Sequence, residues 1–293
     1  MFVDLLLIFI IKSFQFLLHV MPEKAQHGAG ISMGRLAFLF LKKRRMIALS
    51  NLRRVFRNMD DKGIGDIAEA CFERLGINFV ESILMPYVSR EDRIERFTIE
   101  NKHYMDDALS MGKGVIALVF HYGNWEIMGV TSLLLQEEVV ALARPLKRHV
   151  MLNNFLNKLR SATGLKIIPN ANTGRDIFRL LRENKIVAIL GDQREKRSAG
   201  VYVDFFGEKV PTNRGIATIG MKTGAPVIPV FPVREGFLRY RVVFNEPLVM
   251  EKNGNIHELI EKNTRKINAF LETIILKNPE EWFWVHRRWG RNA

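Results

Sequence analysis

His121 and Glu126 are the two residues whose types and spacing are best suited to acid–base chemistry. They follow the apolar run Gly114–Phe120, which is typical of a buried strand. Ligands of an α/β sheet bind beyond the carboxyl ends of its strands, where His121 falls. A loop of this length can fold the Glu126 carboxylate onto one imidazole nitrogen and leave the other free as a general base. The spacing alone also fits a strand-end histidine and a solvated glutamate.

Other kinds of active site lack their residues. The sequence has no GxSxG elbow for a serine nucleophile, and its one cysteine, Cys71, excludes internal disulfides and a CxxC metal site. The remaining histidines are scattered, with no HExxH or His-x-His pairing, so we expect no metal site. Dinucleotide and P-loop signatures are absent as well. The expected chemistry therefore needs no bound metal or cofactor.

The basic charge predicts a partner that carries phosphate or acidic groups. The 293 residues include 44 Lys and Arg against 31 Asp and Glu, a formal net charge of +13. Eight basic and no acidic residues lie between Arg35 and Arg57, among them Arg44 and Arg45. The sequence shows none of the common nucleic-acid-binding signatures. We therefore expect an anionic membrane surface and no nucleic acid; a non-catalytic basic protein that binds membrane or nucleic acid is the alternative of a different class.

Residues 1–21 are predicted to form an anchor. They are apolar apart from a few positions, with Phe9 and Phe14 as candidate lipid-contacting residues. Lys12 interrupts the run, the charge order differs from that of a secretory signal peptide, and no cleavage site precedes Pro22. The segment either spans the membrane or lies in its plane; packing on the protein's own core is the plainer alternative. Together with the basic cluster it predicts a membrane location.

The pattern after Asn101 predicts an α/β fold with a largely parallel sheet flanked by helices, preceded by a helical, membrane-facing N-terminal extension. A helix over Ile67–Leu84 is expected to begin at an N-cap, Asp66, and stop before Pro86. The predicted strands are Gly114–Phe120, Val139–Ala143, Leu165–Ile168, Ile186–Leu190, Val227–Phe231 and Leu238–Phe244. The predicted helices are Trp125–Leu135, His149–Ala162, Arg175–Glu183, Ile216–Lys222 and His257–Leu276. We divide the chain into an anchor (1–21), a helical region (22–100) and a catalytic domain (101–293), with 22–293 as one compact unit.

The motif His121 to Glu126 at a strand end resembles the lysophospholipid/glycerolipid acyltransferase superfamily. Its context resembles the bacterial lipid A late acyltransferases, a family that also includes phosphatidylinositol mannoside acyltransferases. The residues that carry this resemblance, in order, are His121-Tyr-Gly-Asn-Trp-Glu126, Arg144-Pro145, Gly191-Asp192-Gln193, Val203-Asp-Phe-Phe-Gly207, Thr212 to Gly215, Pro226-Val-Ile-Pro229 and Trp282-Phe-Trp-Val-His-Arg-Arg-Trp289. The implied fold is glycerolipid-acyltransferase-like, and the implied place is the cytoplasmic face of the bacterial inner membrane.

The resemblance implies acyl transfer from an acyl carrier protein or coenzyme A thioester to a hydroxyl of a membrane glycolipid, with a lipid A precursor as the expected acceptor. His121 would be the general base that Glu126 orients, with no acyl-enzyme. Phosphatidylinositol mannoside and lysophosphatidate are alternative acceptors. An acidic carrier protein would be steered by a basic face, so we expect it as the donor. Backbone amides near Gly123 or Gly207, or a nearby arginine, are candidates for the oxyanion site.

The expected substrate-binding residues are Arg144, Arg160, Asp192, Gln193, Phe206, Gly207 and Thr212. Arginine suits phosphate groups of either substrate, although a solvated basic face would give the same pattern. Asp192 is either a site residue that positions an arginine or the acceptor, or a turn aspartate. Phe206 and Gly207 are expected to shape an acyl-facing wall. Trp282, Trp284 and Trp289 suit either an interfacial belt or closure of the core by a C-terminal segment.

Overall fold

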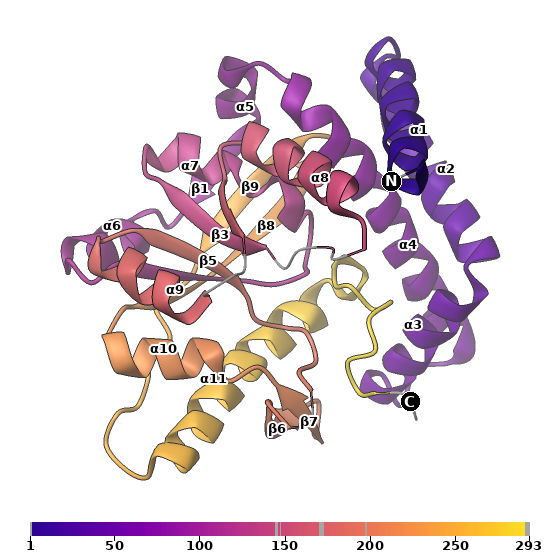
Figure 1. Cartoon of the computed structure of the whole chain (residues 1–293). Helices are drawn as coiled ribbons and strands as arrows, with labels where there is room; N and C mark the ends of the chain where they lie inside the picture. The colour runs from indigo at the N-terminus through magenta and orange to yellow at the C-terminus, as the bar shows by residue number, and fades with distance from the viewer. Residues whose placement is uncertain (1, 144–145, 147, 170–172, 197, 291–293) are drawn as a thin grey trace.

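A seven-stranded sheet forms the centre of the molecule in this computed structural model, which describes residues 2–143, 146, 148–169, 173–196 and 198–290 (Figure 1). Its strands are β1 (Phe97–Glu100), β2 (Val115–Val119), β3 (Val139–Ala143), β4 (Lys166–Pro169), β5 (Ile186–Leu190), β8 (Val227–Gly236) and β9 (Arg239–Phe244). They lie in the order β1-β9-β8-β2-β5-β3-β4. Neighbours pair in parallel except β8 and β9, which are antiparallel. The predicted α/β fold with a largely parallel sheet is confirmed.

Helices cover both faces of this sheet, because successive residues of each strand point to opposite sides. Ile116 and Leu118 of β2 pack with α9, α10 and α11, whereas Val115 and Ala117 pack with α6 and α7. These helices are α6 (His103–Ser110), α7 (Val130–Leu135), α9 (Thr173–Arg182), α10 (Gly215–Thr223) and α11 (Ile256–Lys277); α5 (Arg90–Arg96) and α8 (Val150–Ala162) lie on the outside. Strands buried on both faces explain the continuous apolar runs of the sequence.

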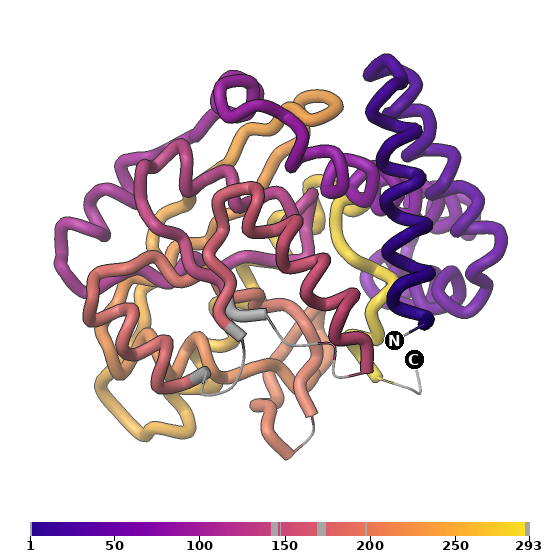
Figure 2. The backbone as a smooth tube through the Cα atoms, turned by 45° about the horizontal axis from the view of Figure 1, so that its top comes forward, coloured from indigo at the N-terminus to yellow at the C-terminus, as the bar shows by residue number. Residues whose placement is uncertain are grey.

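Four helices form the N-terminal region: α1 (Phe2–His19), α2 (Glu23–Phe40), α3 (Lys42–Val55) and α4 (Asp61–Leu84). Helices α2 and α4 approach very closely, because a Cβ atom at Gly34 would lie 2.3 Å from the carbonyl oxygen of Phe72. Figure 2 shows α1 running beside α8, and α1 also contacts α4. The N-terminal helices therefore adjoin the α/β part rather than standing apart from it.

Two predicted elements differ from those observed. Helix α4 begins six residues earlier than predicted, because the N-cap is Asp60 and not Asp66; the Asp60 carboxylate accepts the amide hydrogen bond of Gly63 (2.8 Å). The predicted helix over Trp125–Leu135 is interrupted, with a 3-10 turn, η2 (Trp125–Ile127), preceding α7. The Asn124 side chain does not cap this turn, since it is directed into a buried polar network instead.

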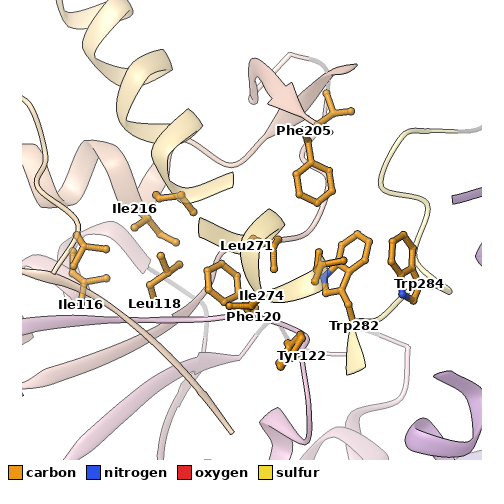
Figure 3. Close-up of a cluster of buried hydrophobic side chains, with 14 of the residues drawn as sticks. Ile116, Leu118, Phe120, Tyr122, Phe205, Ile216, Leu271, Ile274, Trp282 and Trp284 are labelled. Atoms are coloured by element: carbon orange, nitrogen blue, oxygen red, sulfur yellow. The ribbon is translucent and has the colours of Figure 1, made fainter. Parts of the chain in front are cut away.

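The C-terminal segment closes the core against α3, α4 and α11. Trp282 and Trp284 are almost completely buried and pack edge to face, with ring centroids 4.7 Å apart (Figure 3). Phe205 packs on Trp282 from the hairpin β6 (Val201–Phe205) and β7 (Glu208–Thr212). The interfacial-belt interpretation is therefore wrong for Trp282 and Trp284, and closure of the core is correct. The turns η1 (Met85–Tyr87) and η3 (Pro279–Glu281) complete the described elements.

Candidate active site

His121 lies at the carboxyl end of β2 and is held by a buried carboxylate from the neighbouring strand. Its Nδ1 atom is 2.7 Å from Oδ1 of Asp192, and its backbone amide donates to Oδ2 at 3.0 Å. Because β2 and β5 are parallel, with Val119 opposite Leu190, both residues emerge at the same edge of the sheet. Trp282 donates its indole Nε1–H to Oδ2, also at 3.0 Å. Asp192 thus receives hydrogen bonds at both oxygens and is only 2% exposed.

This arrangement determines the protonation of the imidazole. Burial alone would raise the pKa of Asp192, but the nearby imidazole and the hydrogen bonds hold it below its ordinary value. An ionised carboxylate only accepts, so the proton it shares lies on Nδ1 and the lone pair is on Nε2. Burial pulls the pKa of His121 down, but the charge and hydrogen bond of Asp192 outweigh it and raise the pKa above 6.5. Nε2 is thus a base whose basicity Asp192 increases.

Glu126 does not contact the imidazole, contrary to the sequence-based expectation. Its carboxylate forms a bidentate ion pair with Arg160 of α8, with distances of 2.6 Å to Nε and 2.9 Å to Nη2. The guanidinium of Arg160 offers two parallel donors and a full charge, which a carboxylate prefers to one imidazole N–H. The expected orienting role therefore belongs to Asp192 in this structure, whereas Glu126 affects His121 only through its charge. Arg160 does lie at the site, as predicted.

An apolar cavity of about 230 Å³ opens beside His121, Glu126 and Arg160. It runs along the sheet face that carries Ala117 and Val119 of β2 and Ala188 of β5. Its other lining residues are Met105, Trp125, Met128, Thr131, Leu135, Val139, Ala141, Leu165, Ile167, Ile186, Ile189, Leu190, Val230 and Phe244. The cavity exists because the side chains at the centre of the sheet are small alanines, and helix α7 covers it. A polar mouth and an apolar interior suit an amphipathic ligand.

The loop between β2 and η2 is fixed by polar residues of α4 that sequence reasoning missed. Asn78 donates to the carbonyl oxygen of Gly123 at 2.7 Å, and Asn124 donates to the fully buried Glu81 at 2.9 Å. Arg234 pairs with the same carboxylate, and this pairing offsets much of the cost of burying its charge. The sequence did contain a signal for a buried polar group, because Glu81 lies on the same face of α4 as the apolar residues Ile77, Val80 and Leu84.

Gln193 lies where the sequence placed it, next to the base. Its side-chain Nε2 is 3.1 Å from Nε2 of His121, so that the amide donates to the imidazole lone pair. The following residue, Arg194, donates its backbone amide to Nε2 of His286 at 3.2 Å. Burial lowers the pKa of His286 to about 4, so this ring is neutral and can accept the bond. The loop after β5 is thereby held at the mouth of the cavity.

Of the predicted substrate-binding residues that the structure describes, Arg160 lines the cavity, whereas Asp192, Gln193, Phe206, Gly207 and Thr212 do not. Thr212 is fully buried and accepts a hydrogen bond from Arg288 at 2.7 Å, so its role here is structural. Phe206 and Gly207 form the turn of the β6–β7 hairpin, both with positive φ (52° and 79°), and the Phe206 amide donates to Glu272 of α11. The expected acyl-facing wall is therefore wrong for these two residues. Arg144 lies outside the described residues.

Both candidate oxyanion amides already have partners. The Gly123 amide donates to the carbonyl oxygen of Glu281 at 2.9 Å, and the Gly207 amide donates to Asp204 at 3.0 Å. Neither is therefore free to bind a developing negative charge. Near His121, the Gln193 amide donates to Nε2 of the imidazole itself, and the Arg160 guanidinium donates to Glu126 and Asn157, so these donors are engaged as well.

The candidate membrane residues lie on two helices, the phenylalanines on α1 and the arginines on α3. Phe9 on α1 is 69% exposed, whereas Phe14 is half-buried against the cluster of Leu18, Val80 and Ile83. Arg44 and Arg45 of α3 are tied to backbone carbonyls, those of Val285 and Phe38. By length and composition, α1 is the one candidate membrane span among the described residues, which is weak evidence for a span.

One edge of α1 is attached to α8. The carboxylate of Asp4 is buried, accepts the amide hydrogen bond of Met151 at 3.1 Å and lies 2.6 Å from Nδ1 of His149. Most of the remaining circumference of α1 is apolar and exposed, including Phe2, Leu5, Phe9 and Phe16. One edge of α1 therefore packs on the protein, as one sequence-based alternative predicts. A wide apolar surface of the same helix faces outward, as the anchor alternative requires.

Comparison with known proteins identifies the family to which the chain belongs. The profile of the bacterial lipid A biosynthesis acyltransferase family matches residues 3–291, nearly the whole chain. The chain belongs to this family. As a member of the lipid A biosynthesis acyltransferase family it is an acyltransferase, which confirms the resemblance seen in the motifs.

Individual relatives of this acyltransferase are distant. The phosphatidylinositol mannoside acyltransferase of Mycolicibacterium smegmatis is 24% identical over 243 residues, which cover 82% of this chain and 77% of the relative. The lipid A biosynthesis lauroyltransferase of Escherichia coli K12 is 22% identical over 271 residues (92% and 86%). The palmitoleoyltransferase of the same organism is 25% identical over 262 residues (88% and 83%). Relatives so different in acceptor and chain do not define the substrates of this protein.

Proposed function

We propose that this acyltransferase moves a fatty acyl chain from a thioester to a hydroxyl of a membrane glycolipid, with His121 as the general base. The observation that carries the proposal is the hydrogen bond between Nδ1 of His121 and the buried Asp192, which leaves the imidazole lone pair on Nε2, at the mouth of an apolar cavity. The acyl chain of the thioester lies in the cavity beneath α7. His121 and Gln193 then face the carbonyl group at its mouth.

The proposed reaction proceeds by direct attack. As the acceptor oxygen bonds to the thioester carbonyl carbon, its proton passes to Nε2 of His121, and Asp192 stabilises the imidazolium. Collapse of the tetrahedral intermediate breaks the carbon–sulfur bond, and the imidazolium returns the proton to the departing thiolate. Proton transfer by a positioned histidine typically contributes about 10²–10⁴-fold to the rate. The Gln193 amide, displaced from Nε2 by the acceptor hydroxyl, donates to the oxyanion.

An acyl carrier protein is the proposed donor, at the cytoplasmic face of the inner membrane. A basic hollow, lined by Lys43, Arg53, Arg54 and Arg287, lies between α3 and the C-terminal segment. The same segment carries His286, whose ring holds the loop of Gln193 and Arg194. A basic surface beside the site steers an acidic carrier toward it. Coenzyme A, with its phosphates, is the alternative donor. The outward apolar face of α1 and the basic α3 support the membrane location.

The acceptor is proposed to be a lipid A precursor, and the similarity to a phosphatidylinositol mannoside acyltransferase supports the second candidate. The test incubates the purified protein with lipid A precursors, phosphatidylinositol mannoside and lysophosphatidate in turn, each with a mixture of acyl-carrier-protein and coenzyme A thioesters. Mass spectrometry of the lipids then identifies the acceptor and the chain added. A mass increase of one acyl group on a lipid A precursor is the expected result. Acylation of phosphatidylinositol mannoside alone would show that it, and not a lipid A precursor, is the acceptor. The absence of an acylated product from every glycolipid would refute the proposal.

A further inference from the structure

A second apolar cavity, of about 330 Å³, lies on the other side of the Glu126–Arg160 ion pair. Leu75, Phe79 and Ile83 form one wall of it from α4, and Leu156 and Leu159 form the opposite wall from α8. These positions recur at three- and four-residue steps, so each helix turns one apolar stripe toward the space. The remaining lining residues are Asn78, Ser82, Asn124, Trp125, Glu126, Arg160 and Phe283.

This cavity and the proposed acyl cavity share a wall close to His121. Trp125, Glu126 and Arg160 line both spaces and therefore form the partition between them. The imidazole of His121 packs on Trp125 and Phe283, with ring centroids 4.8 Å and 5.7 Å away. Both rings border the second cavity. A ligand there is thus separated from the base only by the aromatic pair and the ion pair.

The second cavity also adjoins the helix with the wide apolar surface. Helix α1 contacts both α4 and α8, the two helices that form the walls (Figure 2). Leu18 of α1 belongs to the same cluster as Ile83, and Phe14 and Leu159 pack against that cluster. The packed side of α1 therefore adjoins the helices that form the cavity walls, while its other side, with Phe9 and Phe16, is exposed.

We propose that the cavity between α4 and α8 binds a hydrocarbon chain of the acceptor lipid. The inference rests on the proposed function, in which two amphipathic substrates must meet at one nitrogen. The donor chain fills the space along the sheet, so the acceptor needs a separate apolar site that opens near the same histidine. Hydrocarbon burial then positions the acceptor hydroxyl at Nε2. The Glu126–Arg160 pair keeps the two chains apart.

The test uses a variant that narrows this cavity, and it measures the KM for the acceptor and for the thioester separately. Leu156→Trp, in full-length protein in mixed micelles, is assayed with two acceptors that share headgroup and hydroxyl but carry long or short chains. Displacing two or more buried methylenes predicts a KM for the long-chain acceptor that rises roughly tenfold. The KM for the short-chain acceptor and for the thioester is expected to stay unchanged. Asn154→Trp, at an exposed position on the same helix, is the matched control and should behave as the wild type.

Two further variants guard against a folding defect. Leu156→Ala enlarges the cavity and is expected to extend the range of acceptor chain lengths without changing that of the donor. Ala188→Met, in the sheet cavity, is expected to shorten the preferred donor chain and leave the acceptor KM unchanged. If the KM rises equally for the long- and short-chain acceptors, or if neither Leu156 variant alters the use of acceptors, the inference about this cavity is overturned while the proposed function stands. A wild type that acylates no glycolipid would overturn the proposed function and, with it, this inference.

Discussion

Replacing Asp192 with Asn should abolish the base while changing the shape of the site very little. In the native site Oδ2 of Asp192 accepts two hydrogen bonds, from the His121 amide and from the Trp282 indole, each at 3.0 Å. An asparagine must place its carbonyl oxygen there, because its NH₂ group cannot face two donors. The NH₂ group then occupies the Oδ1 position, 2.7 Å from Nδ1 of His121 in the native site. Nδ1 must accept, and the imidazole proton moves to Nε2.

A protonated Nε2 cannot take a proton from the acceptor, so the rate should fall by about 10²–10⁴-fold, the range found when a histidine base is lost or held in the wrong tautomer. The protein should remain folded, since both Oδ2 hydrogen bonds are kept and the loss of one charge-assisted bond costs about 1.5–3 kcal/mol. The assay compares initial acyl-transfer rates with thermal unfolding midpoints. Histidine-selective ¹⁵N NMR reports the tautomer directly.

Glu126→Gln is the matched control, because it removes a carboxylate of the same site without touching the imidazole hydrogen bond. Its histidine tautomer should stay native, although the loosened Arg160 can slow the reaction. A wild-type rate for Asp192→Asn would refute the assignment of Asp192 as the orienting residue. A tautomer change in Glu126→Gln but not in Asp192→Asn would return that role to Glu126.

Three more predictions concern the pH profile, the oxyanion and the donor. Because the base must be neutral and the pKa of His121 is raised, kcat/KM should be lost as the pH falls through that raised pKa. Glu126→Gln should shift this acidic limb of the pH profile to lower pH, because the charge of Glu126 raises the pKa of His121, and an unshifted limb would exclude this charge effect. Gln193→Leu should lower kcat roughly 10²–10³-fold with little change in KM, as loss of an oxyanion donor does, whereas a change in KM alone would make Gln193 a binding residue. Lys43→Glu with Arg287→Glu should raise the KM for acyl carrier protein thioesters, more so at low salt, and leave that for coenzyme A thioesters nearly unchanged; equal effects would argue against carrier docking there.

The sequence predicted the parallel strands well, because a strand such as Val115–Val119 is buried on both faces and stands out as an apolar run. The short strand Phe97–Glu100 and the Val201–Thr212 hairpin went unpredicted. Both carry mixed polar and apolar residues, and their pairing partners are not apparent from local pattern. The division into anchor, helical region and catalytic domain stays a prediction.

For the site, the sequence singled out His121 but not the carboxylate that contacts its imidazole. Spacing along the chain favoured Glu126, five residues from His121, whereas Asp192 is 71 residues away and reaches the ring because β2 and β5 are neighbours in the sheet. Strand order is a tertiary property that local periodicity does not encode. The residues that fix the loop, Asn78 and Glu81, come from a helix far upstream for the same reason.

The central claim, that His121 is the base of an acyl transfer, is tested most directly by the single-turnover rate of His121→Ala. The measurement uses purified full-length protein, an acyl carrier protein thioester and a lipid A precursor in mixed micelles, with donor binding checked on the same sample. If His121 is the base, donor binding is kept while the acyl-transfer rate falls by about 10²–10⁴-fold. Transfer at the wild-type rate by His121→Ala would contradict it.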